Sequence, residues 1–372
     1  MKNSTSKTEL QRALQKLSKA TPTRSTIPIL SCVLIEATEE GTTLRSTDLE
    51  ITIITSIESS IEDPGSAAIP LQPLSEITSE LPDDTRITIE VNENNNVKII
   101  TEIGSYDLMG KPADEFPATP ELNQRLDMGI DANVLNEMIS TVSFAVSRDD
   151  LKPSLAGVYF KFEKESLTAV ATDGHRLAKY VRSDFKAGEF QGEVIVPRKF
   201  LNIINSYISK DETTQLLLGD SVFTATIGAD TIYTRIIDER FPDYQSVIPT
   251  DNEKEIRASC DELLSAVKRV SIFSNKATHQ IAIRAANGSA TITTEDPEKA
   301  SKAQETINIE YDGDSIDVGY NAAYLKDILA HMKSDEIVIK LNTPISAGLF
   351  YPTSLNDNVE ITMLLMPIRL ND

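Results

Sequence analysis

Asp173 and His175 stand two residues apart, and such a pair can orient an imidazole as a general base. The chain holds only two further histidines, His279 and His331. It contains no G-x-S-x-G sequence, no Walker loop and no metal-ligand spacing. Asp173-Gly174 is also a strong hairpin signal, which would place His175 beside a turn. We therefore expect no catalytic residue, no metal and no cofactor, and an enzyme is kept as a rival hypothesis.

The clearest pattern in the chain is a repeat with a period of 125 residues. The recurring pairs are Phe116-Pro117, Phe241-Pro242 and Met366-Pro367, together with Thr47-Asp48 and Thr172-Asp173. Self-similarity at a fixed period indicates repeated structural units, and each unit is long enough to hold its own core. The sequence therefore predicts three tandem copies of one domain. Their predicted bounds are 1–122, 128–250 and 251–372.

Each copy is predicted to contain a helix, strands, a second helix and further strands, which indicates an α+β fold. The apolar faces of the opening helices are Leu10, Leu14 and Leu17; Leu135, Met138, Ile139 and Val142; and Leu263, Ala266, Val267 and Val270. Second helices are predicted to begin near Pro70, Pro197 and Asn321. Strands are predicted over 44–54, 87–91, 158–162, 281–292, 307–311 and 337–341. Hairpin turns are predicted at Asn94-Asn95-Asn96, Asp173-Gly174, Asn287-Gly288 and Asp312-Gly313.

The composition is typical of a soluble globular protein of the cytoplasm. Hydrophobic residues make up 40% of the 372 positions and charged residues 25%. No apolar run approaches the roughly 18 residues of a membrane span, so no membrane partner is expected. The opening Met1-Lys2-Asn3-Ser4 lacks the apolar stretch of a signal peptide. Cys32 and Cys260 have no partner pattern, which suits a reducing compartment.

The charge of −21, from 57 acidic and 36 basic side chains, argues against a nucleic-acid partner if it is taken alone. Net charge does not say where the charges lie, however. Much of the basic charge falls on or beside the predicted helices, at Lys7, Arg12, Lys16, Lys19, Arg24, Arg148, Arg198, Lys199, Lys210, Lys268, Lys326 and Lys333. If these helices face one way, one surface is basic and can track phosphates without reading bases. The alternative is that they are ordinary solvated helix faces.

Four segments carry a family resemblance. They are Ala171-Thr172-Asp173-Gly174-His175-Arg176-Leu177-Ala178, Val196-Pro197-Arg198-Lys199, Arg240-Phe241-Pro242-Asp243-Tyr244 and Met366-Pro367-Ile368-Arg369-Leu370. These segments resemble the bacterial replicative sliding clamps, the beta subunits of DNA polymerase III. The resemblance implies three clamp domains per chain, with helices lining a channel, and a homodimer closed head-to-tail into a ring. It also implies a processivity factor that encircles double-stranded DNA and tethers the polymerase alpha subunit, the clamp loader and other proteins with a clamp-binding motif.

The resemblance implies DNA contacts from four basic residues. By matching position, Arg24, Arg198 and Lys199 resemble channel contacts of the family, and Arg148 lies near another. Two places depart from the family pattern. Pro70-Leu71-Gln72-Pro73 lacks the basic pair often found there, and Pro153-Ser154 replaces aromatic residues that some clamps present to DNA.

The resemblance further implies a cleft between the second and third domains that binds short peptides of client proteins. The matching positions are Leu155, Thr172, Gly174, His175, Arg176, Leu177, Pro242, Val247, Tyr324, Ile345, Leu364, Met366, Pro367 and Arg369, and Pro344 could equally fill the place of Ile345. Apolar anchors with a few polar groups are what a short peptide needs.

For the ring interface, the resemblance places Ile272 and Phe273 of the third domain opposite Tyr106 and Leu108 of the partner's first domain. Exposed apolar residues suit a heterologous contact that closes a ring. The alternative is that all four residues belong to their own cores. A second rival to the clamp is a repeat scaffold that binds only proteins, which would also suit the acidic composition.

Overall fold

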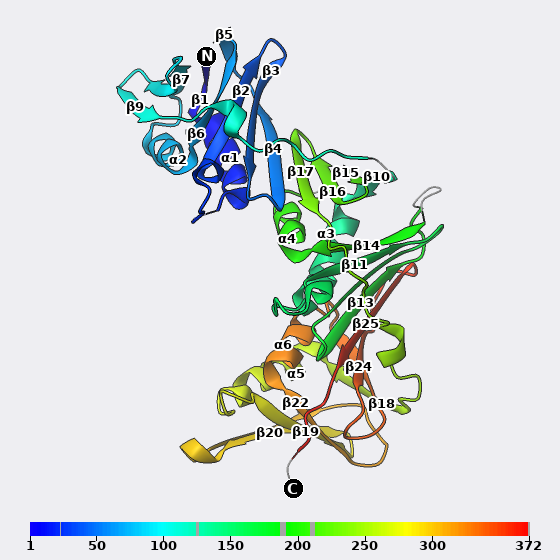
Figure 1. Ribbon diagram of the computed structural model, residues 1–372. Helices are drawn as coiled ribbons and strands as arrows, with labels where there is room; N and C mark the ends of the chain where they lie inside the picture. The colour runs from blue at the N-terminus through cyan, green and yellow to red at the C-terminus, as the bar shows by residue number, and fades with distance from the viewer. Residues whose placement is uncertain (23, 124–125, 187–190, 209–212, 371–372) are drawn as a thin grey trace. The chain divides into compact units, whose positions relative to one another are not determined.

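Figure 1 shows the computed structural model, which describes residues 1–372 apart from 23, 124–125, 187–190, 209–212 and 371–372. The chain divides into two compact units. Unit 1 is Met1–Asn133 with Asn202–Ile236, and unit 2 is Val134–Leu201 with Ile237–Asp372. Each sheet lies within a single unit.

The described residues form six α-helices, which begin where the sequence predicts. They are α1 (Lys7–Leu17), α2 (Leu71–Glu80), α3 (Ala132–Val142), α4 (Arg198–Asn205), α5 (Cys260–Ser271) and α6 (Ala322–Ala330). The hydroxyl groups of Ser6 and Ser259 cap α1 and α5 by accepting hydrogen bonds from backbone amides of the first turn. The apolar faces predicted for α1, α3 and α5 are buried, because an amphipathic helix is stabilised mainly by packing of that face.

Unit 1 holds two antiparallel sheets. The five-stranded sheet has the order β5-β1-β7-β8-β9, with bounds β1 (Lys2–Ser6), β5 (Ser60–Asp63), β7 (Arg86–Val91), β8 (Asn96–Ile100) and β9 (Ser105–Met109). The eight-stranded sheet has the order β10-β15-β16-β17-β4-β3-β2-β6. Its bounds are β2 (Cys32–Thr38), β3 (Gly41–Thr47), β4 (Ile51–Ile57), β6 (Gly65–Pro70), β10 (Leu126–Asp131), β15 (Thr213–Leu218), β16 (Val222–Ile227) and β17 (Asp230–Arg235).

Unit 2 repeats this plan. Its eight-stranded sheet has the order β14-β11-β12-β13-β25-β24-β23-β18, and its four-stranded sheet has the order β21-β20-β19-β22. The bounds in the first are β11 (Gly157–Phe162), β12 (Leu167–Thr172), β13 (Arg176–Arg182), β14 (Gly192–Pro197), β18 (Lys254–Ser259), β23 (Glu336–Leu341), β24 (Gly348–Pro352) and β25 (Val359–Leu365). Those in the second are β19 (Gln280–Ala286), β20 (Ser289–Asp296), β21 (Ser301–Asn308) and β22 (Ile316–Asn321).

Successive repeats are joined by strand pairing inside the eight-stranded sheets. In unit 1, β4 pairs with β17, and in unit 2, β13 pairs with β25 over the register from Arg176↔Leu365 to Arg182↔Val359. The predicted α+β fold is confirmed. No helix in the described part of the chain is both long and apolar enough to cross a membrane.

The predicted hairpin at Asp312-Gly313 is wrong. Strands β21 and β22 lie at opposite edges of the four-stranded sheet and do not pair with each other. The backbone of Glu310 instead exchanges hydrogen bonds of 2.8 and 3.0 Å with Arg257, and β21 ends at Asn308, before the end of the predicted strand 307–311. A long-range partner has overridden a local turn signal.

The predicted strand 44–54 is in fact two strands with a tight turn between them. Strand β3 ends at Thr47 and β4 begins at Ile51. Leu49 has a φ of 77°, in the left-handed region that a leucine rarely adopts. The segment 281–292 is likewise divided, at the predicted turn Asn287-Gly288, whose φ angles are 48° and 73°.

Replacing Leu14 by alanine should destabilise unit 1, because Leu14 is fully buried in α1. Loss of its side chain leaves a cavity, and we expect the free energy of unfolding to fall by about 2–5 kcal/mol. Urea denaturation followed by circular dichroism measures this change. Gln15→Ala, on the exposed side of the same helix, is the control and should stay within about 0.5 kcal/mol of the wild type. Equal denaturation midpoints for the two variants would contradict the assignment of the buried face.

Candidate peptide-binding site

All residues predicted for the peptide cleft lie in unit 2, and Arg176, Leu177 and Leu364 lie where β13 pairs with β25. Leu177 and Leu364 are register partners there and are 1% and 2% exposed. Both belong to a hydrophobic cluster that also contains Tyr159 and Phe241, whose rings stack with centroids 4.8 Å apart. Leu155 is partly buried and packs against the same cluster. Leu155, Leu177 and Leu364 therefore form one apolar floor.

Four further predicted cleft residues keep their side chains exposed. Val247, Ile345 and Met366 are 53%, 62% and 43% exposed, and Pro242 is also exposed. Large apolar side chains at the surface are available to a partner. Their exposure beside a buried apolar cluster fits a site that takes apolar side chains of a peptide.

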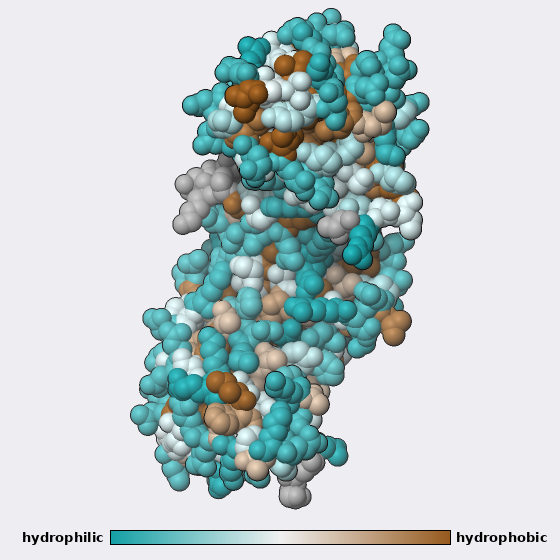
Figure 2. All heavy atoms as spheres, turned by 90° about the vertical axis from the view of Figure 1, so that its left-hand side faces the viewer, coloured by the Kyte–Doolittle hydropathy of each residue, from teal (hydrophilic) through white to brown (hydrophobic). Residues whose placement is uncertain are grey.

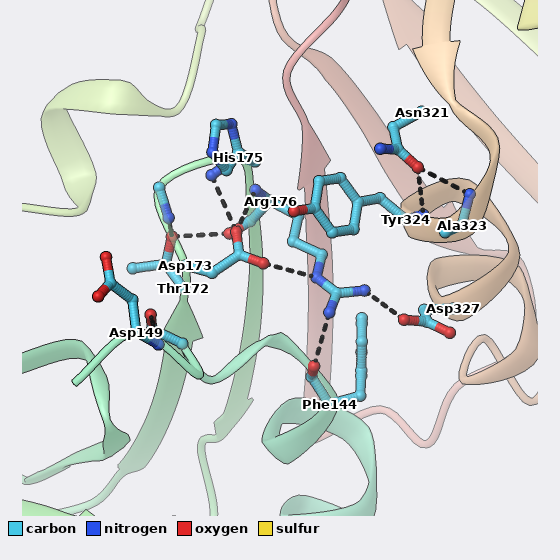
Figure 3. A network of polar contacts seen from close by, with 12 residues as sticks. Phe144, Asp149, Thr172, Asp173, His175, Arg176, Asn321, Ala323, Tyr324 and Asp327 are labelled. Atoms are coloured by element: carbon cyan, nitrogen blue, oxygen red, sulfur yellow. Dashed lines mark hydrogen bonds and ion pairs between the residues drawn. The ribbon is translucent and has the colours of Figure 1, made fainter. Parts of the chain in front are cut away.

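The turn between β12 and β13 is held by its own side chains (Figure 3). The Thr172 hydroxyl donates to the carbonyl of Arg176 at 2.7 Å and accepts from the amide of Gly174 at 3.1 Å. Asp173 Oδ1 accepts from the amides of His175 and Arg176 at 2.9 and 3.0 Å. Gly174 has a φ of 91°, which glycine adopts without strain.

The same turn recurs between β3 and β4, which explains the repeated Thr-Asp pair. The Thr47 hydroxyl donates to the carbonyl of Ile51, and Asp48 Oδ1 accepts from the amides of Glu50 and Ile51. Leu49, with its φ of 77°, occupies the place of Gly174. The recurring residues therefore serve as turn caps in both repeats.

Asp173 and His175 do not form the arrangement that orients a general base. The hydrogen bond from His175 to Asp173 runs through the backbone amide. The imidazole instead stacks on the ring of Tyr324, with centroids 5.9 Å apart and an angle of 18° between the rings. Among the described residues, no group of three histidine, cysteine, aspartate or glutamate side chains could hold a metal ion.

The side chain of Arg176 is only 8% exposed and makes three hydrogen bonds within the protein. Its Nε donates to Asp173 Oδ2 at 3.1 Å, its Nη1 to Asp327 Oδ2 at 2.6 Å and its Nη2 to the Phe144 carbonyl at 3.0 Å (Figure 3). The guanidinium lies over the rings of Tyr324 and Phe144, 4.6 and 5.2 Å from their centroids. Burial of a charge requires such pairing.

The segment Met366–Leu370 is docked by two backbone hydrogen bonds. The amide of Met366 donates to the carbonyl of His175 at 2.8 Å, and the amide of Ile368 donates to the carbonyl of Gly319 on β22 at 2.8 Å. Pro367 is half-buried between these contacts, whereas Arg369 is exposed. The segment therefore runs from the β12–β13 turn to the edge strand of the four-stranded sheet.

The residues predicted to contact DNA lie on the surface or near it. Arg24 is exposed in unit 1. In unit 2, Arg148 and Lys199 are exposed and Arg198 is half-buried. Burial, and after it the positive charge of Arg148, lowers the pKa of Arg198. The charges of Arg148 and Arg198, fifty residues apart in the chain, therefore interact in the folded protein.

Several of the predicted helix cations are already paired. Lys7 is only 6% exposed and bonds Asp83 at 2.6 Å, so it is no part of a basic surface. Lys16 pairs with the buried Asp230. Lys19 donates to Ser206 and lies over the Tyr207 ring, 4.6 Å from its centroid. Burial, followed by the nearby charge of Lys16, lowers the pKa of Lys19. Lys210 lies outside the described residues.

The residues predicted for the ring interface are accessible to different degrees. Ile272 and Phe273 follow α5 and are 76% and 44% exposed, so they are not members of a core within this chain. Tyr106 and Leu108 are half-buried on β9. Figure 2 shows apolar atoms gathered on unit 1, in the upper part of the view, where Figure 1 places β7 and β9. Ile103 and Met109 contribute exposed apolar side chains beside them.

Two residues that shape the site are not apparent from the sequence. Asp327 and Phe144 hold the guanidinium of Arg176, yet neither belongs to a recognisable motif. They lie 151 and 32 residues from Arg176 in the chain, and only the fold brings them to it. Spacing along the sequence carries no signal for contacts of this kind.

Three family models match the chain in order. The model of the N-terminal domain of DNA polymerase III beta subunit matches residues 1–120, that of the central domain 129–243 and that of the C-terminal domain 245–369. The chain is 30% identical over 365 residues to the beta sliding clamp of Pseudomonas putida, covering 97% of this chain and 98% of the relative. It is 27% identical to that of Vibrio cholerae, over the whole of both chains.

Solved structures agree with these matches over full length. The DNA polymerase III subunit beta from Pseudomonas aeruginosa superimposes with a TM-score of 0.94 at 28% identity, covering 100% of both chains. A sliding clamp from the same species, solved bound to griselimycin, gives a TM-score of 0.93 at 29% identity, with the same coverage.

Replacing Gly319 by alanine should release the segment Met366–Leu370. A Cβ at this position would lie 2.4 Å from the carbonyl oxygen of Ile368, so the segment or β22 must move. Hydrogen exchange followed by mass spectrometry should show the Ile368 amide exchanging at least about tenfold faster, because its backbone partner is lost. Gly104→Ala, where the nearest atom would be 3.4 Å away, is the control. Unchanged exchange in Gly319→Ala would show that the docking does not depend on this close approach.

Proposed function

The chain belongs to the family of DNA polymerase III beta subunits, and we propose that it is a sliding clamp that keeps a replicative DNA polymerase on its template. The observation that carries this proposal is the ordered match of three different domain models along one chain. Two chains close head-to-tail into a ring of six similar domains around double-stranded DNA. The domain bounds remain those proposed from the sequence, 1–122, 128–250 and 251–372.

A ring holds DNA by topology, so its contacts can be weak and need not read the sequence. Arg24, Arg148, Arg198 and Lys199 are the proposed DNA contacts. The repulsion between the charges of Arg148 and Arg198 supports this role, because a phosphate bound near both would relieve it. Contacts of this kind to phosphates weaken as salt rises, which lets the duplex slide. The net charge of −21 disfavours DNA elsewhere on the surface.

The ring closes through sheet edges and apolar side chains. Strands β9 and β21 each end a sheet, so each has an edge without a partner strand among the described residues. Such edges invite pairing with another chain. Ile272 and Phe273 of one chain then cover Tyr106 and Leu108 of the next. The two surfaces differ, so the contact is heterologous, and two copies of it close the ring.

The site in unit 2 is the proposed docking place for client peptides. The apolar floor of Leu155, Leu177 and Leu364 supports this role, together with the exposed Val247, Ile345 and Met366. The related clamp from Pseudomonas aeruginosa was solved bound to griselimycin, which we expect this chain to bind as well. An affinity of about micromolar, roughly −8 kcal/mol, lets clients exchange on one ring. The clients are the polymerase alpha subunit, the clamp loader and other proteins with a clamp-binding motif.

We assign no catalytic residue, no cofactor and no metal, and we place the protein in the cytoplasm, on the chromosome. The turn that holds Asp173 and His175 supports a structural role for both residues. A protein-binding scaffold built from repeats is the remaining rival. It differs from a clamp in whether the protein stays linked to closed circular DNA.

Retention on circular DNA separates the clamp from the scaffold. Protein placed by a clamp loader and ATP on a nicked circular plasmid should co-elute with the DNA in gel filtration at a salt concentration that removes electrostatic binding. Cutting the circle once should release the protein, because a ring slides off a free end. The uncut plasmid is the control. Protein that never co-elutes, or that stays after linearisation, would refute the clamp.

The double replacement Ile272→Ala with Phe273→Ala should separate the dimer into monomers. Two large apolar side chains are lost from the proposed interface, so we expect the dissociation constant to rise by about a hundredfold or more. Sedimentation velocity across a dilution series measures it. Leu355→Ala removes an exposed apolar side chain outside the proposed interface and should leave the dimer intact. A double variant that sediments as the wild type would refute the assignment.

A further inference from the structure

We propose that Asp327 and Phe144 are positioning residues of the peptide site, and that they act through Arg176. The guanidinium of Arg176 does not touch the peptide. It holds in place the side chains that do, chiefly the ring of Tyr324. The inference rests on the proposed peptide-binding function of unit 2. It assigns a role to two residues that lie outside the predicted cleft.

The guanidinium of Arg176 is not accessible to a ligand. All three of its nitrogen atoms donate within the protein, to Asp173, Asp327 and the carbonyl of Phe144. The central carbon of its guanidinium also lies over the rings of Tyr324 and Phe144. With 8% of the side chain exposed, a carboxylate or carbonyl of a peptide cannot approach the plane of the guanidinium.

The contacts of Arg176 join elements of two repeats. Arg176 begins β13, and Phe144 lies in the 3₁₀ turn Ser143–Ala145 that follows α3. Tyr324 and Asp327 both belong to α6, three residues apart and thus on one face of that helix. The bond to Asp327 and the stacking on Tyr324 therefore fix the rotation of α6 against the start of β13.

Arg176 also links two pairs of stacked rings (Figure 3 shows the centre of this group). His175 stacks on Tyr324, and the guanidinium of Arg176 lies over the rings of both Tyr324 and Phe144. Phe144 stacks in turn on His331, with ring centroids 4.3 Å apart and an angle of 15°. The predicted cleft residues His175 and Tyr324 thus owe their orientation to groups behind them.

Asp327 is the point at which this support can be tested without unfolding the protein. Its side chain is 50% exposed, whereas that of Asp173 is 13% exposed and also caps the turn. Neutralising Asp327 leaves Arg176 paired with Asp173, so the buried charge keeps one partner. We therefore expect the side chains on this face of α6 to be held less tightly, while the protein stays folded.

The test compares Asp327→Asn with Asp327→Glu in the full-length dimer, with griselimycin as the probe in isothermal titration calorimetry. Asp327→Asn should weaken binding by about three- to tenfold, because one charge-assisted hydrogen bond to Arg176 is lost. Asp327→Glu restores the charge and should recover binding to within about twofold of the wild type. Asp184→Asn breaks a similar exposed pair with Arg182 at the other end of β13 and should leave binding unchanged.

A second readout does not depend on the peptide. The chain has no tryptophan, so Tyr324→Trp introduces a single tryptophan beside Arg176, whose emission can be excited separately from that of the tyrosines. In this background Asp327→Asn should shift the emission to longer wavelength, as the ring loses its cover, and Asp184→Asn should not. Wild-type protein that fails to bind griselimycin refutes the cleft and the positioning role with it. Wild-type binding that Asp327→Asn leaves unaltered refutes the positioning role alone, whatever the fluorescence shows.

Discussion

Antiparallel pairing between strands of successive repeats is the constraint on which the remaining features depend. In unit 1, β17 of the second repeat pairs with β4 of the first, and in unit 2, β25 of the third pairs with β13 of the second. Each junction turns two half-sheets into one eight-stranded sheet. Because side chains alternate along a strand, a slip of one residue would move each buried side chain to the other face. The register therefore determines which side chains face the site, as well as which are buried in the core.

The two junctions have the same backbone plan but different surfaces. The Thr-Asp turn is repeated with the same hydrogen bonds, yet Leu49 and Ile51 stand in unit 1 where Gly174 and Arg176 stand in unit 2. Only the junction in unit 2 has an arginine that can donate a hydrogen bond to α6. One scaffold thus carries a purely structural junction and a junction with the features of a binding site, and the difference lies in a few side chains.

The basic residues of the chain fall into two groups with different roles. The chain is strongly acidic, yet the charges of Arg148 and Arg198 lie close enough to affect each other. Lys7 and Lys16, in contrast, form ion pairs with carboxylates within the fold. The proposed functions need both kinds of residue. Structural ion pairs stabilise the units, and the proposed DNA contacts weakly attract phosphates. The same distinction separates Arg176, which is enclosed, from Arg369, which is exposed.

The sequence by itself determined the repeat, the six helices, most of the turns and the family, because these depend on local periodicity and on motifs that are contiguous in the chain. It also located Leu155, Leu177 and Leu364 through the resemblance. Only the tertiary structure decided that Asp327 and Phe144 accept hydrogen bonds from Arg176 and that Lys7 is buried. It also decided that no hairpin forms at Asp312-Gly313. Each of these depends on partners far away in the chain, and the packing that selects such partners leaves no mark on local spacing.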